Sequence, residues 1–189
     1  HLIHFFIFMH WCAGRTLQLL KHQVRRKNLS YWLQPIGEIF VIEDQKYLNK
    51  WLGTEGSQFD EADSDYDKSS EITEYIDKIS VNNRPILILG DEPMQMIIKE
   101  CENEHYLIRW SYASVDFYVE EHIQNIALSN QLENQIQPSV EVLFQSNDIV
   151  VHNASITGSS DMNTFKIKLN KPNLIVTTYK SEPDEETLM

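Results

Sequence analysis

Residues 86–93 have the sequence Ile-Leu-Ile-Leu-Gly-Asp-Glu-Pro, an apolar run followed directly by a turn. Four consecutive aliphatic residues bounded by a turn are typical of a buried strand. Gly90 tolerates a positive φ and Pro93 fixes its own φ, so both are predicted to be structural turn residues, with Gly90 at positive φ. The turn therefore places two carboxylates, Asp91 and Glu92, at the end of a buried strand.

A β-hairpin is predicted immediately before this turn. Residues 75–81 and 85–89 are both strand-like, and only a few residues separate them. Asn82 and Asn83 tolerate the left-handed backbone conformation that a tight turn between antiparallel strands requires. The hairpin therefore predicts that neighbouring strands pair in antiparallel fashion.

The remaining chain shows the same succession of short strands with few helices. Further strands are expected at 37–42, 94–100, 105–112, 140–144, 149–151, 165–169 and 174–178. Short helices are expected at 43–52, where Trp51 and Leu52 share a face, at 65–71 behind an N-cap at Asp63 or Ser64, and after Ser114. The predicted fold class is α+β, with a largely antiparallel sheet and a few short helices.

Two regions of different composition divide the 189 residues. Residues 1–28 carry five basic residues and no acidic one, so we expect a basic and apolar N-terminal extension that lies outside the fold. Residues 29–189 carry a net charge of −17 and are long enough for one α+β domain. Such a charge repels nucleic acids and attracts basic protein surfaces.

Neither a cofactor nor a metal site is predicted. Cys12 and Cys101 are isolated in the sequence, and the histidines show no metal-ligand spacing. His105, His122 and His152 are each expected to be an ordinary surface or half-buried histidine. Reduced cysteines favour a cytoplasmic location. The apolar run at residues 2–12 is too short to span a membrane, and no membrane partner is expected.

The paired carboxylates are the remaining candidates for chemistry. Asp65 and Asp67, or Asp91 and Glu92, lack a nucleophile, a histidine partner or a phosphate-binding loop, so no catalytic residue is predicted and the protein is not expected to be an enzyme. The alternative is a small metal-dependent hydrolase or nucleotide-handling enzyme that uses these four acids around a divalent cation. Structural roles are open too: helix capping for the aspartates, and bonds to turn amides for Asp91 and Glu92.

Arg109 and Trp110 are adjacent in a predicted strand. Because successive side chains of a strand point to opposite faces, we expect Trp110 in the core and Arg109 paired with a nearby acid.

Several motifs occur together in an order that resembles the Immunity protein 21 family. They are Trp51-Leu52-Gly53, Asp65-Tyr66-Asp67, Leu89-Gly90-Asp91-Glu92-Pro93 and Arg109-Trp110-Ser111-Tyr112-Ala113. The resemblance covers roughly residues 30 to 189. It implies a small α+β bacterial protein that binds a cognate toxin of a polymorphic toxin system and neutralises it by occlusion. The partner-binding residues that it suggests are Asp65, Tyr66, Asp67, Asp91, Glu92, Arg109 and Trp110.

Overall fold

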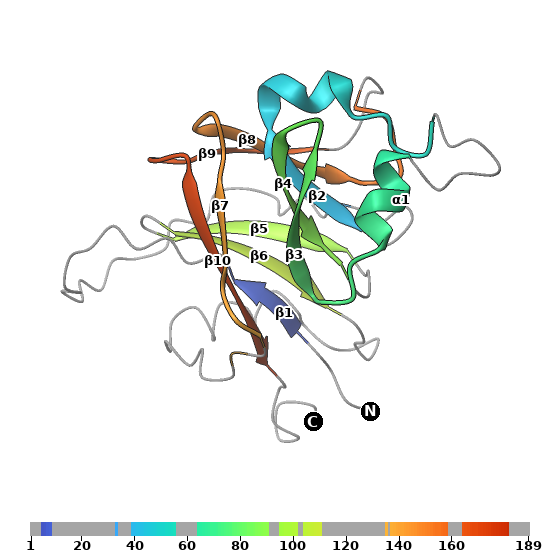
Figure 1. The fold of residues 1–189 in the computed structure, drawn as a ribbon. Coiled ribbons are helices and arrows are strands. Elements are labelled where there is room, and N and C mark those ends of the chain that lie inside the picture. Colours follow the sequence, from blue (N-terminus) through green and yellow to red (C-terminus); the bar gives the residue numbers. More distant parts are fainter. Residues whose placement is uncertain are drawn as a thin grey trace.

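Two five-stranded antiparallel sheets form the described part of the protein (Figure 1). The computed structural model describes residues 5–8, 33, 39–55, 64–90, 95–101, 104–110, 135, 137–158 and 164–181. One sheet has the strand order β5-β6-β1-β10-β7 and the other the order β3-β4-β2-β8-β9.

The bounds of these elements agree with most of the predicted ranges. The strands are β1 (Phe5–Phe8), β2 (Phe40–Asp44), β3 (Ile76–Val81), β4 (Arg84–Leu89), β5 (Met96–Cys101), β6 (Glu104–Trp110), β7 (Val140–Leu143), β8 (Asp148–Asn153), β9 (Phe165–Lys168) and β10 (Asn173–Ser181). The helices are the 3-10 helix η1 (Gln45–Lys50) and the α-helix α1 (Asp65–Ser70). Antiparallel sheets with few short helices are compatible with the predicted α+β class.

The predicted hairpin is confirmed as β3 and β4. Val81 pairs with Arg84 across the turn, and Asn82 and Asn83 adopt φ values of 50° and 61°. Both asparagines thus occupy the left-handed region that favours Asn and Gly. The hairpin fixes the register of β4, which continues into Gly90.

The main core lies between the two sheets. Every described strand except β1, whose side chains are not described, contributes buried or partly buried apolar side chains to it. The fully buried run of β4 explains why this strand is apolar without alternation: Leu87 and Leu89 face the other sheet, and Ile86 and Ile88 face a second cluster. The prediction that this strand is buried is therefore confirmed.

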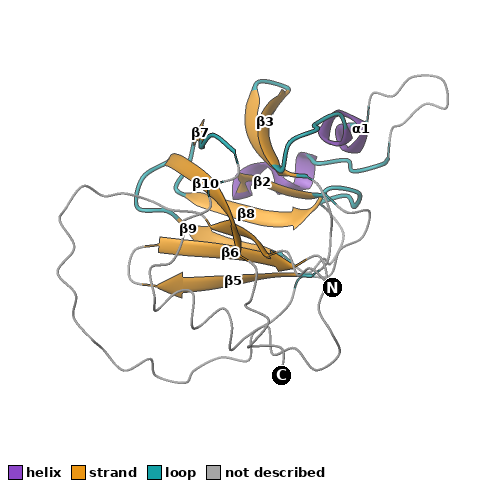
Figure 2. Ribbon diagram, turned by 90° about the horizontal axis from the view of Figure 1, so that it is seen from below, coloured by secondary structure: helices purple, strands orange, loops and turns teal. Residues whose placement is uncertain are grey.

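The second cluster lies on the outer face of the β3-β4-β2-β8-β9 sheet. Trp51, which follows η1, packs there with Val41 and Ile88, and Tyr66 of α1 lies against the same cluster. Figure 2 shows the two helices beside β2 and β3, away from β5 and β6. This second layer buries the outer face of the sheet and positions the surface around α1.

Hydrogen bonds connect the loop after η1 to the segment after β8. Trp51 Nε1 donates to the Ala154 carbonyl oxygen at 2.8 Å, and Thr54 N donates to the Ser155 carbonyl oxygen at 3.2 Å. Gly53 adopts a φ of 59°, and a Cβ there would lie 2.6 Å from the Ser155 oxygen. A glycine is needed at this position for both reasons.

The N-terminal extension contributes a strand, contrary to the expectation for these four residues. Phe5–Phe8 forms β1, which pairs with β6 on one side and β10 on the other. The facing edges of β6 and β10 have backbone groups that need hydrogen-bonding partners, and this apolar segment pairs with both strands. The rest of residues 1–28 lies outside the described residues, and the division of the chain at residue 28 stays a prediction.

The helix predictions have mixed outcomes. The predicted helix at 43–52 is the shorter η1, and Trp51 and Leu52 do not share a face: Trp51 is 1% exposed and Leu52 is 51% exposed. The extended backbone at Trp51 ends the helix and separates the two side chains. The helix predicted after Ser114 lies outside the described residues.

Candidate functional site

The predicted Asp65-Tyr66-Asp67 motif forms the first turn of α1. Ser64 caps the helix: its Oγ accepts from Asp67 N at 3.0 Å, and its own backbone N–H donates to Asp67 Oδ2 at 3.1 Å. This reciprocal pair is a capping box, so Asp67 has the helix-capping role that the sequence left open beside partner binding. Asp65 is buried and its Oδ2 accepts from Leu52 N at 3.0 Å, while Tyr66 N donates to the Gly53 oxygen. Both carboxylates therefore stabilise the local fold.

Gly90 and Arg109 are also brought together. Arg109 Nη1 donates to the Gly90 carbonyl oxygen at 2.7 Å, and the guanidinium carbon lies 5.4 Å from the centre of the Phe40 ring. With Trp110 expected in the core, Arg109 was expected to point outward. This was wrong, because the Arg109 side chain is only 2% exposed. Its face of β6 is the one that packs between the sheets, as Leu107 does. The side chain of Trp110 is not among those described.

The expected positive φ at Gly90 is not present, because the structure has a positive-φ glycine at Gly53 but not at Gly90. The reason for a glycine here is space. A Cβ at Gly90 would lie 2.7 Å from Ile72 Cδ1 and 2.9 Å from the Glu74 oxygen. The segment that follows α1 thus packs directly on the end of β4.

Gly90→Val is expected to lower the free energy of unfolding by about 1–3 kcal/mol, through overpacking rather than backbone strain. Chemical denaturation measures this loss. The double variant Gly90→Val with Ile72→Ala should lose less than the two single variants together, because Ile72 supplies the nearest atom. Strictly additive losses would contradict this packing, and so would an unchanged single variant.

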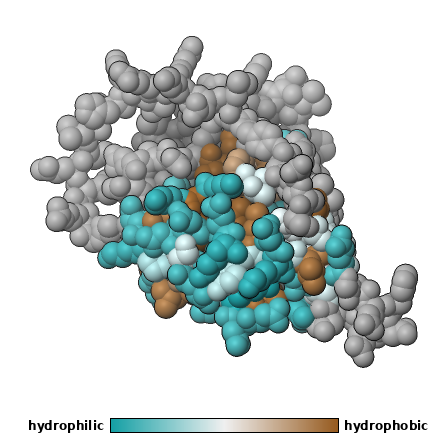
Figure 3. Space-filling view, turned by 90° about the horizontal axis from the view of Figure 1, so that it is seen from above, coloured by the Kyte–Doolittle hydropathy of each residue, from teal (hydrophilic) through white to brown (hydrophobic). Residues whose placement is uncertain are grey.

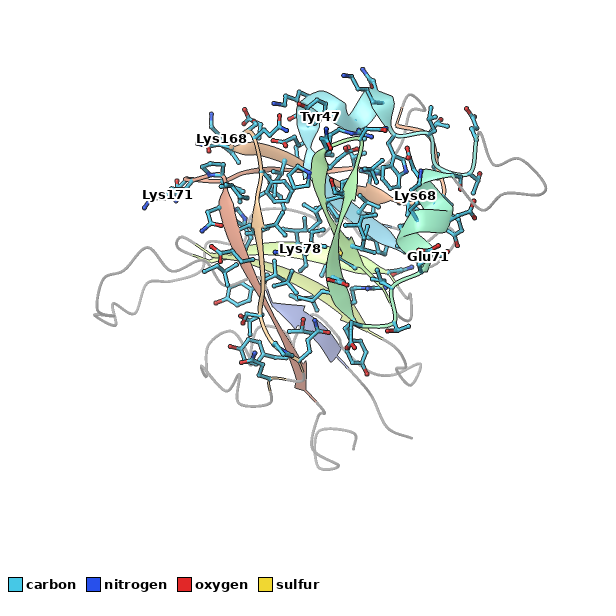
Figure 4. All side chains as sticks on the ribbon, in the orientation of Figure 1. Tyr47, Lys68, Glu71, Lys78, Lys168 and Lys171 are labelled. Atoms are coloured by element: carbon cyan, nitrogen blue, oxygen red, sulfur yellow. The ribbon has the colours of Figure 1, made fainter. Side chains whose placement is uncertain are left out.

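An acidic segment joins these motifs in space. We use this name for residues 71–77, which run from the end of α1 into β3 and carry three exposed acids, Glu71, Glu74 and Asp77. Figure 4 shows Glu71 on the same side of the molecule as Lys68 of α1. Through Ile72 and Glu74 this segment contacts Gly90, which in turn contacts Arg109. The acidic segment, which was not among the predicted site residues, therefore connects three predicted elements: α1, Gly90 and Arg109.

Asp91, Glu92 and Pro93 lie outside the described residues. Their predicted roles in the turn and in partner binding therefore stay predictions. The alternative metal-dependent enzyme would use Asp91 and Glu92 together with the two aspartates of α1. In the described part of the chain, no group of three or more His, Cys, Asp or Glu side chains could hold a metal ion.

Among the same residues, no helix has both the length and the apolar character needed to cross a membrane.

Charge is distributed unevenly between the described ranges and the rest of the chain. The described residues include 12 acidic and 11 basic residues and are close to neutral. Beyond residue 28, the remaining segments carry 16 acidic residues and no Lys or Arg. The sheets therefore form a nearly neutral scaffold, and the acidity of the chain belongs mainly to the segments between and after the strands.

A buried polar cluster was missed by the sequence analysis. Glu43 of β2 accepts from Arg84 Nη1 at 3.3 Å through Oε2, and its Oε1 lies 3.2 Å from His152 Nε2. All three side chains are nearly inaccessible, so the expectation that His152 is a surface or half-buried residue was wrong. A glutamate that follows three apolar residues in one strand was the available signal, since buried acids are rarely left unpaired.

Both ring nitrogens of His152 have polar neighbours. Nδ1 lies 3.1 Å from the Asn153 carbonyl oxygen, and Nε2 faces the Glu43 carboxylate. The edge of the Trp51 ring packs on the imidazole, with 5.5 Å between ring centres. This arrangement connects β2, β4 and β8, and the three side chains are almost completely shielded from solvent.

Comparison with known proteins returns no match: no family model, no curated protein and no solved structure is significantly similar to the chain. The resemblance to the Immunity protein 21 family stays a prediction.

Proposed function

We propose that the protein is an immunity protein that binds a cognate toxin of a bacterial polymorphic toxin system and neutralises it by stoichiometric occlusion in the cytoplasm. The resemblance of the sequence motifs supports this function. The structural observation that carries the proposal is the acidic segment, because its exposed carboxylates adjoin the predicted motifs.

The acidic segment suits fast association with a basic surface. Among the described residues, Glu71 and Glu74 form no ion pair, so their charges are available to a partner. Asp77 is exposed and accepts from the adjacent Lys78 N. Exposed charges steer encounter at little desolvation cost, whereas buried anchors set the lifetime of a complex.

Asp65 and Asp67 have a supporting role in this proposal. Their carboxylates hold α1 and the loop at Leu52, and α1 leads directly into the acidic segment. Asp91 follows Gly90 in the chain, so the second predicted acidic pair continues from a residue that already contacts Glu74. The expected contact surface therefore includes the acidic segment, and Asp91 and Glu92, which lie outside the described residues, stay predicted contacts.

The test is binding to the toxin-like product of the adjacent gene, measured by surface plasmon resonance at two salt concentrations. The variant Glu71→Lys with Glu74→Lys should associate about tenfold more slowly at low salt, because two attractive charges become repulsive. The effect should shrink at high salt, where such charges are screened. Co-expression with the toxin provides a second measurement, in which cell survival is compared between the wild-type protein and the charge-reversed variant.

The matched control is Glu141→Lys with Asp148→Lys, which reverses two exposed acids outside the acidic segment. Equal slowing in both variants would mean that only net charge matters and that the acidic segment is not the contact surface. Cells that die in spite of the wild-type protein, with no complex formed, would rule out the immunity function.

A further inference from the structure

The outer edge of β3, on the side away from β4, has no strand partner in the described part of the chain, because β3 is the last strand of its sheet. Such an edge carries backbone groups that can pair with a strand of another chain. Here a side chain bonds to them. Ile76 N donates to Gln137 Oε1 at 3.3 Å, and Gln137 Nε2 donates to the Ile76 carbonyl oxygen at 3.0 Å. One amide side chain thus takes the place of a strand residue.

The next backbone donor along this edge is capped as well. Because alternate residues of an antiparallel strand direct their backbone groups to the same side, Lys78 and Ser80 face outward like Ile76. Lys78 N donates to Asp77 Oδ1 at 2.7 Å. Lys78 Nζ donates to the Glu141 carbonyl oxygen of β7 at 3.0 Å, and Figure 4 shows this side chain extending from β3 toward β7. Side chains therefore close two of the three outward positions of β3.

The residues of β3 suit pairing with the same strand of a second copy of the chain. In a two-fold antiparallel arrangement centred on Ile79, Lys78 would lie opposite Ser80 of the second copy, so no like charges would face each other. The outward backbone groups of these two residues would bond across the two-fold axis. Ile79, which is half-buried against the second cluster, would lie beside its own counterpart. The edge is therefore self-complementary in this register.

Both side-chain contacts oppose this pairing. Asp77 occupies the Lys78 N–H that would have to bond to the second copy. Gln137 holds the segment before β7 beside Ile76, where the same register would bring Asn82 of the second copy. Figure 3 shows the face that carries the hairpin turn as mainly hydrophilic with separate hydrophobic spots. Strand pairing, and not an apolar patch on that face, would therefore be the basis for association.

We propose that the outer edge of β3 is a strand-pairing surface for a second copy of the chain, and that Asp77 and Gln137 keep it closed in the monomer. Opening the edge requires rotation of the Asp77 side chain and withdrawal of the segment at residue 137, while the pairing of β3 with β4 stays intact. Because Asp77 also belongs to the acidic segment, pairing of two copies would cover one end of that segment. The inference concerns the chain alone and does not depend on the toxin proposal.

The test is sedimentation velocity of the full chain over a range of concentrations. Asp77→Ala combined with Gln137→Leu removes both contacts and should dimerise with a dissociation constant about tenfold or more below that of the wild-type protein. Asp77→Ala alone should shift it in the same direction by less. Asp77→Asn keeps an oxygen for Lys78 N, and Glu74→Ala removes an exposed acid that caps no strand residue, so both should behave as wild type. Thermal melting verifies that each variant is folded.

Proline substitutions locate the surface of the dimer. Ser80→Pro, added to the double variant, removes an outward N–H without removing a bond to β4, and it should restore the monomer. The matched control is Lys168→Pro in the same background. Leu169 N donates to the Asn147 oxygen on the β8 side, so the Lys168 N–H faces away from β8 at the edge of the same sheet. This second proline should leave the dimer in place.

Three results would overturn the proposal. The first is a folded double variant, and a folded Asp77→Ala variant, that stay as monomeric as the wild-type protein. The second is equal dimerisation of Glu74→Ala, which would assign the effect to lost charge. The third is a dimer that persists with Ser80→Pro, which would place the contact elsewhere on the molecule.

Discussion

A chain that begins at residue 29 is expected to lose its cooperative unfolding transition. The deletion removes β1, the central strand of one sheet, and leaves β6 and β10 with one strand partner each, β5 and β7 respectively. The sheet is then split into two separate pairs, and the facing edges of β6 and β10 lose their hydrogen bonds, at a cost comparable to the total stability of a domain, about 5–15 kcal/mol. Circular dichroism with thermal melting measures the loss.

A matched pair of variants separates the backbone of β1 from its side chains. Phe6→Ala and Phe6→Pro both remove the aromatic ring, but only proline removes an N–H from a central strand. The proline variant should therefore melt well below the alanine variant. Identical melting of the two, or of the shortened chain and the full chain, would restore the original expectation that residues 1–28 lie outside the fold.

Replacing Glu43 by alanine is expected to lower the free energy of unfolding by about 3–5 kcal/mol. Glu43 is fully buried and bonds Arg84 through one oxygen and His152 through the other. Its removal leaves a buried guanidinium without its carboxylate and opens a cavity at the junction of three strands. Urea denaturation monitored by Trp fluorescence measures the change, since Trp51 packs on His152.

Two further variants identify the cause of this loss. Glu55→Ala removes an exposed acid and should change stability by less than about 0.5 kcal/mol. Glu43→Leu combined with Arg84→Met should be more stable than Glu43→Ala alone, because it removes the unpaired charge and refills the volume. If the double variant is no better than the single one, the charge pair is not the origin of the effect.

The elements that local sequence determines were predictable. The Asn82-Asn83 turn and the Ser64 cap each depend on a few adjacent residues, and both are present in the structure. Most strand ranges also followed from short apolar runs between turn residues. The backbone conformation and the side-chain preferences of such segments are set over a few positions, so a single sequence is enough to find them.

The contacts that define the site were harder to predict from the sequence, because they join distant parts of the chain. Arg109 is buried because its face of β6 packs on the other sheet, and alternation alone could not choose between the two faces. Gly90 is required by the approach of Ile72, which lies in a different element. Glu43 and His152 are 109 positions apart. The sequence indicates that such residues need partners but does not name them.

The position of β1 has a consequence for the order in which the protein can fold. Phe5–Phe8 is synthesised before every other described strand, whereas its partner β10 (Asn173–Ser181) is synthesised after all of them. Pairing over such a separation is slow, and an apolar strand waiting for its partner can pair with other chains. Assembly of this sheet must therefore wait until β10 has been synthesised, and the aromatic segment of β1 is the part that a nascent-chain chaperone would need to shield.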